Sequence, residues 1–127
     1  MKAVVVDTNA FLRLLLDDFP KQADLVKGLI NQAKKEQIRI IIPQIVIFEI
    51  DFILRKYYSF EKQEVINKLK SLLSASYFEV ESISVFRNAL ILYKKNNVSL
   101  VDCFLVSKAE AEEADLFTFD KKLKKLQ

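Results

Sequence analysis

Four carboxylate residues that lie far apart in the sequence each stand beside an apolar run, and they are the side chains best suited to chemistry. They are Asp7, Glu49, Asp102 and Asp120. A carboxylate next to buried apolar surface is costly unless a cation or hydrogen-bond donors hold it. The chain has no histidine, which is the commonest general base. These residues therefore predict a hydrolytic site in which oxygen ligands alone bind a hard cation such as Mg²⁺ or Mn²⁺. The metal would supply the nucleophile.

Alternating strand-like and helix-like runs determine where these carboxylates lie. Short runs of β-branched and apolar residues predict strands at residues 2–6, 38–42, 77–80 and 116–119. The first strand is apolar enough to be buried on both faces, and the second is also expected to be buried. Apolar residues at helical spacing predict helices at residues 10–16, 20–35, 44–58, 61–74, 85–95 and 100–113.

Strands that alternate with helices are typical of a parallel sheet covered by helices on both faces. We therefore expect an α/β fold, specifically a three-layer α/β/α sandwich with a central parallel sheet of about four strands. Functional sites in such sheets gather at the carboxyl ends of the strands. Asp7 and Asp120 directly follow predicted strands, whereas Glu49 and Asp102 lie in the first two turns of predicted helices. All four carboxylates can therefore meet at one edge of the sheet.

Glu49 is the carboxylate that a purely structural role explains least well. At about 100° per residue, Asp51 and Arg55 cluster on one side of the predicted helix, and Glu49 falls nearly opposite them. We therefore expect Glu49 to face inward and Asp51 to lie on the solvated face. The alternative is a buried ion pair between Glu49 and Lys56, two turns further along the same side.

Each of the three aspartates also has a structural alternative. Asp7 and Asp120 both precede helix-like runs, so each could simply cap a helix. Ser99 and Asp102 have capping-box spacing, in which the Asp102 carboxylate reaches back to the Ser99 amide. Asp102 nevertheless shares its helix side with apolar residues and is expected to face inward. Four acids at one edge would repel one another and raise their own pKa values unless a divalent cation neutralised them, which favours a metal site.

Composition predicts a single domain, residues 1–127, that is large enough for a real core. Hydrophobic residues make up 51% of the chain, and only one glycine and two prolines interrupt them, which argues against disorder. The single cysteine, Cys103, excludes an internal disulfide and a cysteine-based zinc site. We expect it to be a small buried side chain in a protein of the reducing cytoplasm. No apolar stretch reaches the length of a membrane span.

The net charge of +3 and the pI near 8.9 mildly favour binding to a polyanion. Apolar residues around Phe11 and Tyr57 supply more apolar surface than so short a chain easily hides, which favours self-association. Several basic side chains could contact phosphate, or could equally form only a solvated surface. They are Arg13, Arg39, Arg55, Lys56, Lys94, Lys95 and the lysines of residues 121–125.

Four short motifs, in this order, resemble the PIN-domain family of metal-dependent nucleases, and most closely the small VapC-type ribonuclease toxins. The resemblance covers nearly the whole chain. It implies a PIN-like nuclease domain in which Asp7, Glu49, Asp102 and Asp120 surround one or two Mg²⁺ or Mn²⁺ ions. It also implies that Asn9 and Thr118 support these acids by hydrogen bonds. The motifs are VVVDTN at 4–9, PQIVIFE at 43–49, SLVDC at 99–103 and FTFDKKL at 117–123.

The same resemblance implies an activity and a set of partners. The expected activity is divalent-metal-dependent endonuclease hydrolysis of RNA phosphodiester bonds, carried out by the toxin of a toxin–antitoxin pair. The expected partners are an RNA substrate, a cognate VapB-type antitoxin and a second copy of the chain in a homodimer. Two departures from the family pattern stand out. Many relatives add a short strand after the last acid, where this chain stops at Gln127, and some carry a hydroxyl residue shortly before the second acid.

Three other functions stay open at this point. A PIN nuclease of the same chemistry could process RNA as a housekeeping enzyme. A catalytically inactive PIN-like module could serve only for binding, although the intact acids argue against it. A phosphotransfer domain would also carry an aspartate after its first strand, but Asp7 has no second acid beside it and the chain has no glycine-rich loop.

Overall fold

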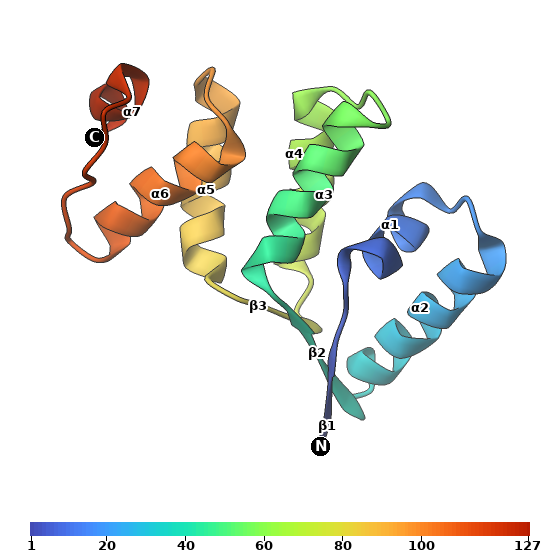
Figure 1. Ribbon diagram of the computed structural model, residues 1–127. Helices are drawn as coiled ribbons and strands as arrows, with labels where there is room; N and C mark the ends of the chain where they lie inside the picture. The colour runs from blue at the N-terminus through green and yellow to red at the C-terminus, as the bar shows by residue number, and fades with distance from the viewer. The chain divides into compact units, whose positions relative to one another are not determined.

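The computed structural model describes all residues, 1–127, and the chain divides into two compact units. The first unit comprises residues 1–81 and contains three strands and four helices (Figure 1). The second unit comprises residues 82–127 and contains three helices. No helix of the chain has the length and apolarity that a bilayer span requires.

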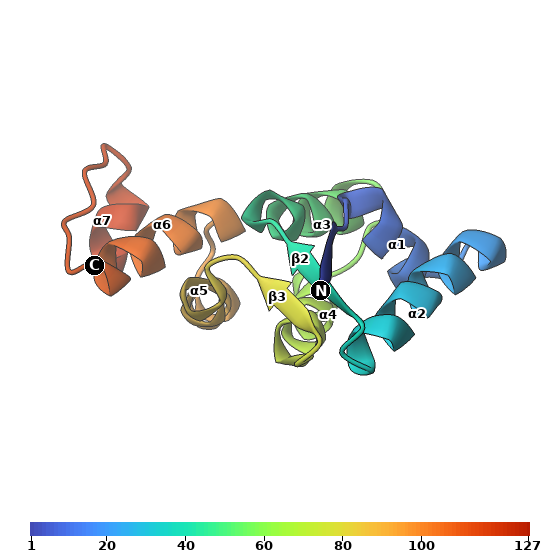
Figure 2. The same cartoon turned by 90° about the horizontal axis from the view of Figure 1, so that it is seen from below.

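The first unit is built on a parallel sheet in the order β1-β2-β3. Its register pairs Val4 with Ile40 and Ile40 with Phe78. Two helices connect each strand to the next, and α1 and α2 lie side by side (Figures 1 and 2). The elements are β1 (Lys2–Val5), α1 (Thr8–Leu16), α2 (Pro20–Lys34), β2 (Ile38–Ile42), α3 (Gln44–Lys56), α4 (Lys62–Ser74) and β3 (Phe78–Val80).

One face of this sheet packs into the core and the other is exposed. In β2, Ile38, Ile40 and Ile42 are buried, whereas Arg39 between them is exposed. Helices α1 and α4 lie over the buried face, because Phe11 of α1 and Leu72 of α4 line one hollow with Phe78 of β3. The prediction that the first strand is buried on both faces is wrong, because Val5 is 64% exposed. In β2, burial alternates from one residue to the next, although Ile40, Ile41 and Ile42 form a continuous apolar run.

Helix boundaries in the first unit follow local signals that the sequence displays. Pro20 occupies the first turn of α2, and Pro43 is the residue before α3. Glu61 and Glu64 form a reciprocal capping box at the start of α4. The core beneath these helices includes Phe11, which stacks edge-on against Phe78 at a centroid separation of 5.4 Å. Phe11 is therefore a core residue rather than part of an exposed apolar surface.

The second unit is a helical pair followed by a short helix: α5 (Ile83–Lys95), α6 (Leu100–Ala111) and α7 (Lys121–Leu126). α5 and α6 pack through Phe86 and Phe104, whose ring centroids are 4.8 Å apart. The buried Ser107 hydroxyl donates a hydrogen bond of 2.7 Å to the Val85 carbonyl across the same contact. Cys103 is fully buried, as its sequence context predicts.

The predicted strand at residues 116–119 is absent, and the sheet has three strands rather than about four. Phe117 and Phe119 are each 86% exposed and contact one another edge-on at 5.3 Å. A run of this length has strand propensity but becomes a strand only when a neighbouring strand pairs with it. The α/β class with a parallel sheet is confirmed, and the order of elements is consistent with the predicted three-layer sandwich.

An ion pair on the exposed face of the sheet predicts a measurable shift in the pKa of one glutamate. Arg39 binds the Glu79 carboxylate with two hydrogen bonds of 2.7 and 2.9 Å. These bonds hold the pKa of Glu79 below its usual value. The ion pair therefore contributes stability above the ordinary glutamate pKa, and the contribution is lost as the pH falls through the lowered value. In Arg39→Ala we expect the Glu79 pKa to rise to its usual range, measured by an NMR pH titration of the side-chain carboxyl.

The matched control for this titration is Lys108→Ala, which removes the cation beside a different glutamate. Lys108 donates a hydrogen bond of 2.8 Å to Glu112 and lowers that carboxyl's pKa. The control variant should raise the Glu112 pKa and leave Glu79 unchanged. A Glu79 pKa that does not move in Arg39→Ala would show that the ion pair does not persist in solution.

Candidate functional site

A cleft of about 300 Å³ opens where β1 ends and α3 begins, and it brings together two of the four predicted carboxylates. Asp7 follows β1 and precedes α1, while Glu49 lies in the second turn of α3. The cleft is at the carboxyl end of the sheet, where sites of parallel α/β folds gather. Its lining residues are Val5, Val6, Asp7, Thr8, Asn9, Pro43, Ile45, Val46 and Glu49.

Asp7 is fixed by the first turn of α1. It is the N-cap residue, and its Oδ1 accepts a hydrogen bond of 2.9 Å from the Ala10 amide. The alternative prediction, that Asp7 caps a helix, is therefore confirmed. The cap occupies only Oδ1, and the structure gives Oδ2 no hydrogen bond. The cap thus orients the carboxylate and leaves one oxygen at the cleft for a ligand.

Glu49 is exposed, so the prediction that it faces inward is wrong. The buried side of α3 consists of Val46, Ile47, Ile50 and Leu54. The expectation rested on four apolar neighbours of Glu49 in the helix, namely Ile45, Val46, Phe52 and Ile53. Two of them are themselves exposed, since Ile45 is 61% and Phe52 is 53% accessible, whereas Val46 is buried. The helix is apolar on more than one side, and periodicity alone therefore could not identify the side that packs on the sheet.

The structural alternative for Glu49, an ion pair with Lys56, is also wrong. Lys56 Nζ lies over the ring of Phe52, 5.1 Å from its centroid. Glu49 makes no ion pair and no side-chain hydrogen bond. An exposed carboxylate in a cleft, without a protein partner, is available to bind something that the chain itself does not supply.

Asn9 and Thr8 complete the polar part of the cleft. Asn9 is exposed, in the first turn of α1, while Thr8 is 6% exposed. Analysis of the sequence missed a further acid at this end of the sheet, Glu81, which follows β3. Its Oε1 accepts a hydrogen bond of 3.1 Å from the Gln44 amide at the start of α3. Glu81 therefore positions the helix that carries Glu49, and its place directly after a strand was the signal that could have identified it.

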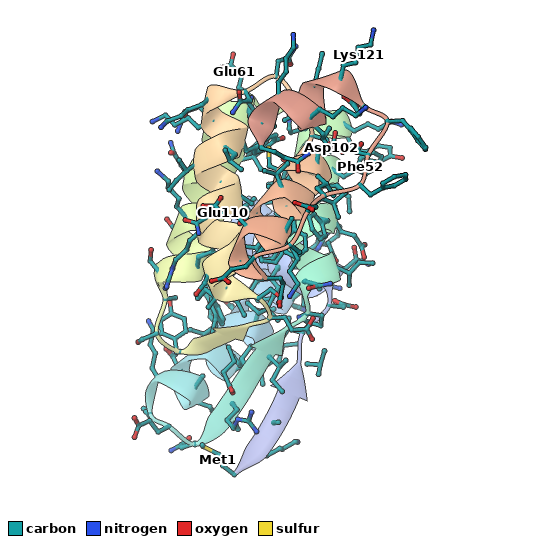
Figure 3. The ribbon with its side chains drawn as sticks, turned by 90° about the vertical axis from the view of Figure 1, so that its left-hand side faces the viewer. Met1, Phe52, Glu61, Asp102, Glu110 and Lys121 are labelled. Carbon is teal, nitrogen blue, oxygen red and sulfur yellow. The ribbon has the colours of Figure 1, made fainter.

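Asp102 belongs to the second unit and lies in the first turn of α6, half-buried. It is labelled in Figure 3. The Ser99 hydroxyl accepts a hydrogen bond of 3.1 Å from the Asp102 amide, so the predicted cap at Ser99 is confirmed. The reciprocal bond of a capping box, from the Ser99 amide to the Asp102 carboxylate, is absent. The carboxylate of Asp102 therefore has no partner within its own helix.

Asp120 also belongs to the second unit and caps α7. Its Oδ1 accepts hydrogen bonds from the amides of Lys122 at 2.8 Å and Leu123 at 3.3 Å. The Asp120 amide in turn donates a hydrogen bond of 3.1 Å to the Thr118 hydroxyl. The cap that the sequence offered as an alternative is thus present, and Thr118 supports the backbone of Asp120 rather than its carboxylate.

None of the four candidate carboxylates forms an ion pair, although acids elsewhere in the chain do. Asp18, Glu79 and Glu112 each bind an arginine or lysine. Two of the arginines considered as phosphate contacts, Arg13 and Arg39, are used in these pairs. Neither unit by itself contains three or more acidic or cysteine side chains grouped closely enough to hold a metal ion. As possible metal ligands, the first unit supplies the carboxylates of Asp7 and Glu49 and the side-chain amide of Asn9.

Comparison with known proteins identifies the class to which this fold and cleft belong. The chain belongs to the PIN domain family, whose model matches residues 4–127. That match includes both units, so the resemblance drawn from four short motifs is confirmed. The chain is also similar to a VapC ribonuclease from Aquifex aeolicus (strain VF5), with 24% identity over 123 residues, covering 96% of this chain and 90% of that protein. No solved structure matches the chain significantly.

Proposed function

We propose that this chain is a divalent-metal-dependent endoribonuclease that hydrolyses RNA phosphodiester bonds, with residues 1–127 acting as a single PIN-like nuclease domain. The observation that carries the proposal is the cleft in which Asp7 and Glu49 lie together and neither forms an ion pair with a lysine or arginine. Membership of the PIN domain family and similarity to a VapC ribonuclease both favour nuclease chemistry.

The donor set of the cleft fits Mg²⁺ or Mn²⁺. These hard cations prefer carboxylate and amide oxygens, and the side-chain ligands that the cleft offers are of this kind. Asp7 keeps Oδ2 without a hydrogen bond, and both oxygens of Glu49 lack a partner. Two carboxylates of like charge in one cleft are also more easily tolerated when a divalent ion binds between them.

We assign roles to the carboxylates as follows. Asp7, Glu49 and Asp102 are direct or close ligands of the metal, while Asp120 holds water or a second ion. Asn9 and Thr118 orient the acids. When bound, the ion supplies a hydroxide nucleophile near neutral pH and offsets the negative charge that develops on the phosphate. The chain's own contribution is to hold the carboxylates in place: the caps fix Oδ1 of Asp7 and of Asp120, and Glu81 fixes the start of the helix that carries Glu49.

The biological role that we propose is that of the toxin in a toxin–antitoxin pair. Its partners would be an RNA substrate, a VapB-type antitoxin that blocks the cleft, and a second copy of the chain in a homodimer. The setting would be the cytoplasm. Similarity to a VapC ribonuclease over nearly the full length of both proteins supports this role over that of a housekeeping nuclease.

The decisive experiment measures metal-dependent cleavage and metal binding on the same preparation. We expect the metal-free protein to be inactive on a mixed-sequence RNA, activity to appear on adding Mg²⁺ or Mn²⁺, and EDTA to abolish it. Isothermal titration with Mn²⁺ should show saturable binding. RNA cleavage that persists in EDTA would contradict the metal mechanism. Absence of both cleavage and Mn²⁺ binding would favour a PIN-like module that serves only for binding.

A further inference from the structure

Two aromatic rings stand exposed at the end of α3, where a water-soluble helix would ordinarily carry polar residues. Phe52 is 53% and Tyr57 is 68% exposed. The rings contact each other edge-on, with centroids 6.2 Å apart and planes at 79°. We call Phe52 and Tyr57 together the aromatic platform. Rings held against each other in this way lose little further freedom on binding a flat partner, because each is already partly ordered.

The aromatic platform continues the wall of the cleft. Ile45, Glu49 and Phe52 are spaced i, i+4 and i+7, so they lie along one face of α3. Ile45 and Glu49 line the cleft. Phe52 is three residues beyond Glu49, which corresponds to about 4.5 Å along the helix axis. A molecule bound at Glu49 can therefore reach Phe52 without leaving this helix.

A cationic group accompanies the platform. Lys56 Nζ is 5.1 Å from the centroid of the Phe52 ring, and Lys56 forms no ion pair with a carboxylate. A second copy of the chain is a poor occupant, because lysine is depleted from the cores of protein interfaces and its charge would be desolvated there. A polyanion that also presents flat apolar rings satisfies both the charge of Lys56 and the exposed faces of the aromatic side chains.

We propose that the aromatic platform stacks the unpaired bases of single-stranded RNA beside the cleavage cleft, with Lys56 contacting a backbone phosphate. This proposal rests on the proposed function and adds a substrate-binding site beside the cleft. Base–aromatic stacking tolerates any sequence, because every base has a flat face, but it requires bases that are not stacked in a duplex. The platform therefore holds an unpaired nucleotide close to the scissile phosphate.

The chain has no tryptophan, which allows a direct test. Phe52→Trp introduces a single indole at the platform, and stacking of a base on it quenches its fluorescence. We expect quenching when a single-stranded RNA of about eight nucleotides, a length within the usual site size, is added in EDTA to prevent cleavage. In Phe52→Leu, which keeps an apolar side chain but no ring, we expect affinity measured with a labelled strand to fall about fivefold to a hundredfold. Phe52→Tyr should retain wild-type affinity.

Two controls separate stacking from general binding. Leu25→Trp places the single indole at another site on the first unit, on α2, where the native side chain is 73% exposed. It should not be quenched by the same RNA. An abasic strand of equal length and a duplex RNA should bind through their phosphates without quenching Phe52→Trp. Equal quenching by the abasic strand, or wild-type affinity in Phe52→Leu, would overturn the proposal.

The same experiments also test whether a second copy of the chain covers the platform, and whether the proposed function is correct. If a second copy covers the platform, Phe52→Trp emission will shift with protein concentration in the absence of RNA, and sedimentation will show Phe52→Leu to be more monomeric; this result would also overturn the proposal. If Mg²⁺-dependent cleavage is absent but Phe52→Trp is quenched by single strands, the proposed function fails and the platform stands. If cleavage is present without quenching, the reverse holds.

Discussion

Replacing Asp7 by asparagine is expected to lower RNA cleavage by about a hundredfold or more, while the free energy of unfolding stays within about 0.5 kcal/mol of wild type. Asparagine caps helices about as well as aspartate, so the hydrogen bond to the Ala10 amide can persist. What the substitution removes is the negative charge and the oxygen Oδ2 that the cap leaves without a partner. Initial cleavage rates at saturating Mg²⁺, together with urea unfolding, measure both effects.

Two further variants separate the cap from the chemistry at this position. Asp7→Ala removes the cap as well as the charge, and it should lose about 1 kcal/mol of stability in addition to activity. Asp24→Asn removes an exposed acid from α2 and should change neither quantity. An Asp7→Asn protein that cleaves RNA within twofold of the wild-type rate would mean that Asp7 is only a helix cap.

The three strands of the sheet and six helices could be predicted because their signals are local. Pro20, Pro43 and Ser99 mark helix starts by chemistry that acts within a few residues, and the observed helices begin where these residues predict. The predicted strand around Phe117 failed for the opposite reason. A strand is stabilised by its neighbour, and the same four residues without a partner remain an exposed segment. Local propensity could not supply that information.

The candidate site was harder to predict, because the sequence shows which face of a helix is apolar but not which face is covered. α3 carries Ile50 and Leu54 on its buried side, and Ile45 and Phe52 on an exposed one. Glu49 lies next to the exposed apolar group, which made it look buried. Its assignment to the cleft is nevertheless supported, since Glu49 and Asp7 line the same hollow. The location was right and the inferred environment was wrong.

Helix capping does not exclude the metal ligation that we propose at Asp7 and Asp120. The sequence presented a cap as the alternative to a ligand at Asp7 and at Asp120, and both residues do cap helices. In each case it is Oδ1 that accepts the hydrogen bonds from the backbone amides of the helix. A carboxylate has two oxygens, so a cap fixes its position and still leaves the second oxygen for a cation.

Asp102→Asn is the variant that tests whether the second unit contributes to the proposed metal site. We expect cleavage to fall by about a hundredfold or more and the affinity for Mn²⁺ to fall with it, because the half-buried carboxylate has no partner in its own helix. The hydrogen bond at the start of α6 should survive, since it is donated by the backbone amide of residue 102 to Ser99. Cleavage rates and Mn²⁺ titration measure the loss, and urea unfolding measures the fold.

Ser99→Ala gives the converse of this variant. It removes the cap but keeps the carboxylate, so it should cost about 1 kcal/mol of stability and leave the cleavage rate of the folded protein near wild type. Comparison of Asp102→Asn with Ser99→Ala therefore shows whether the Asp102 carboxylate stabilises α6 or binds a cation. If Asp102→Asn cleaves at the wild-type rate with unchanged Mn²⁺ affinity, the metal site is confined to Asp7, Glu49 and Asn9, and the four-carboxylate site is wrong. If activity falls only in Ser99→Ala, Asp102 serves the helix alone.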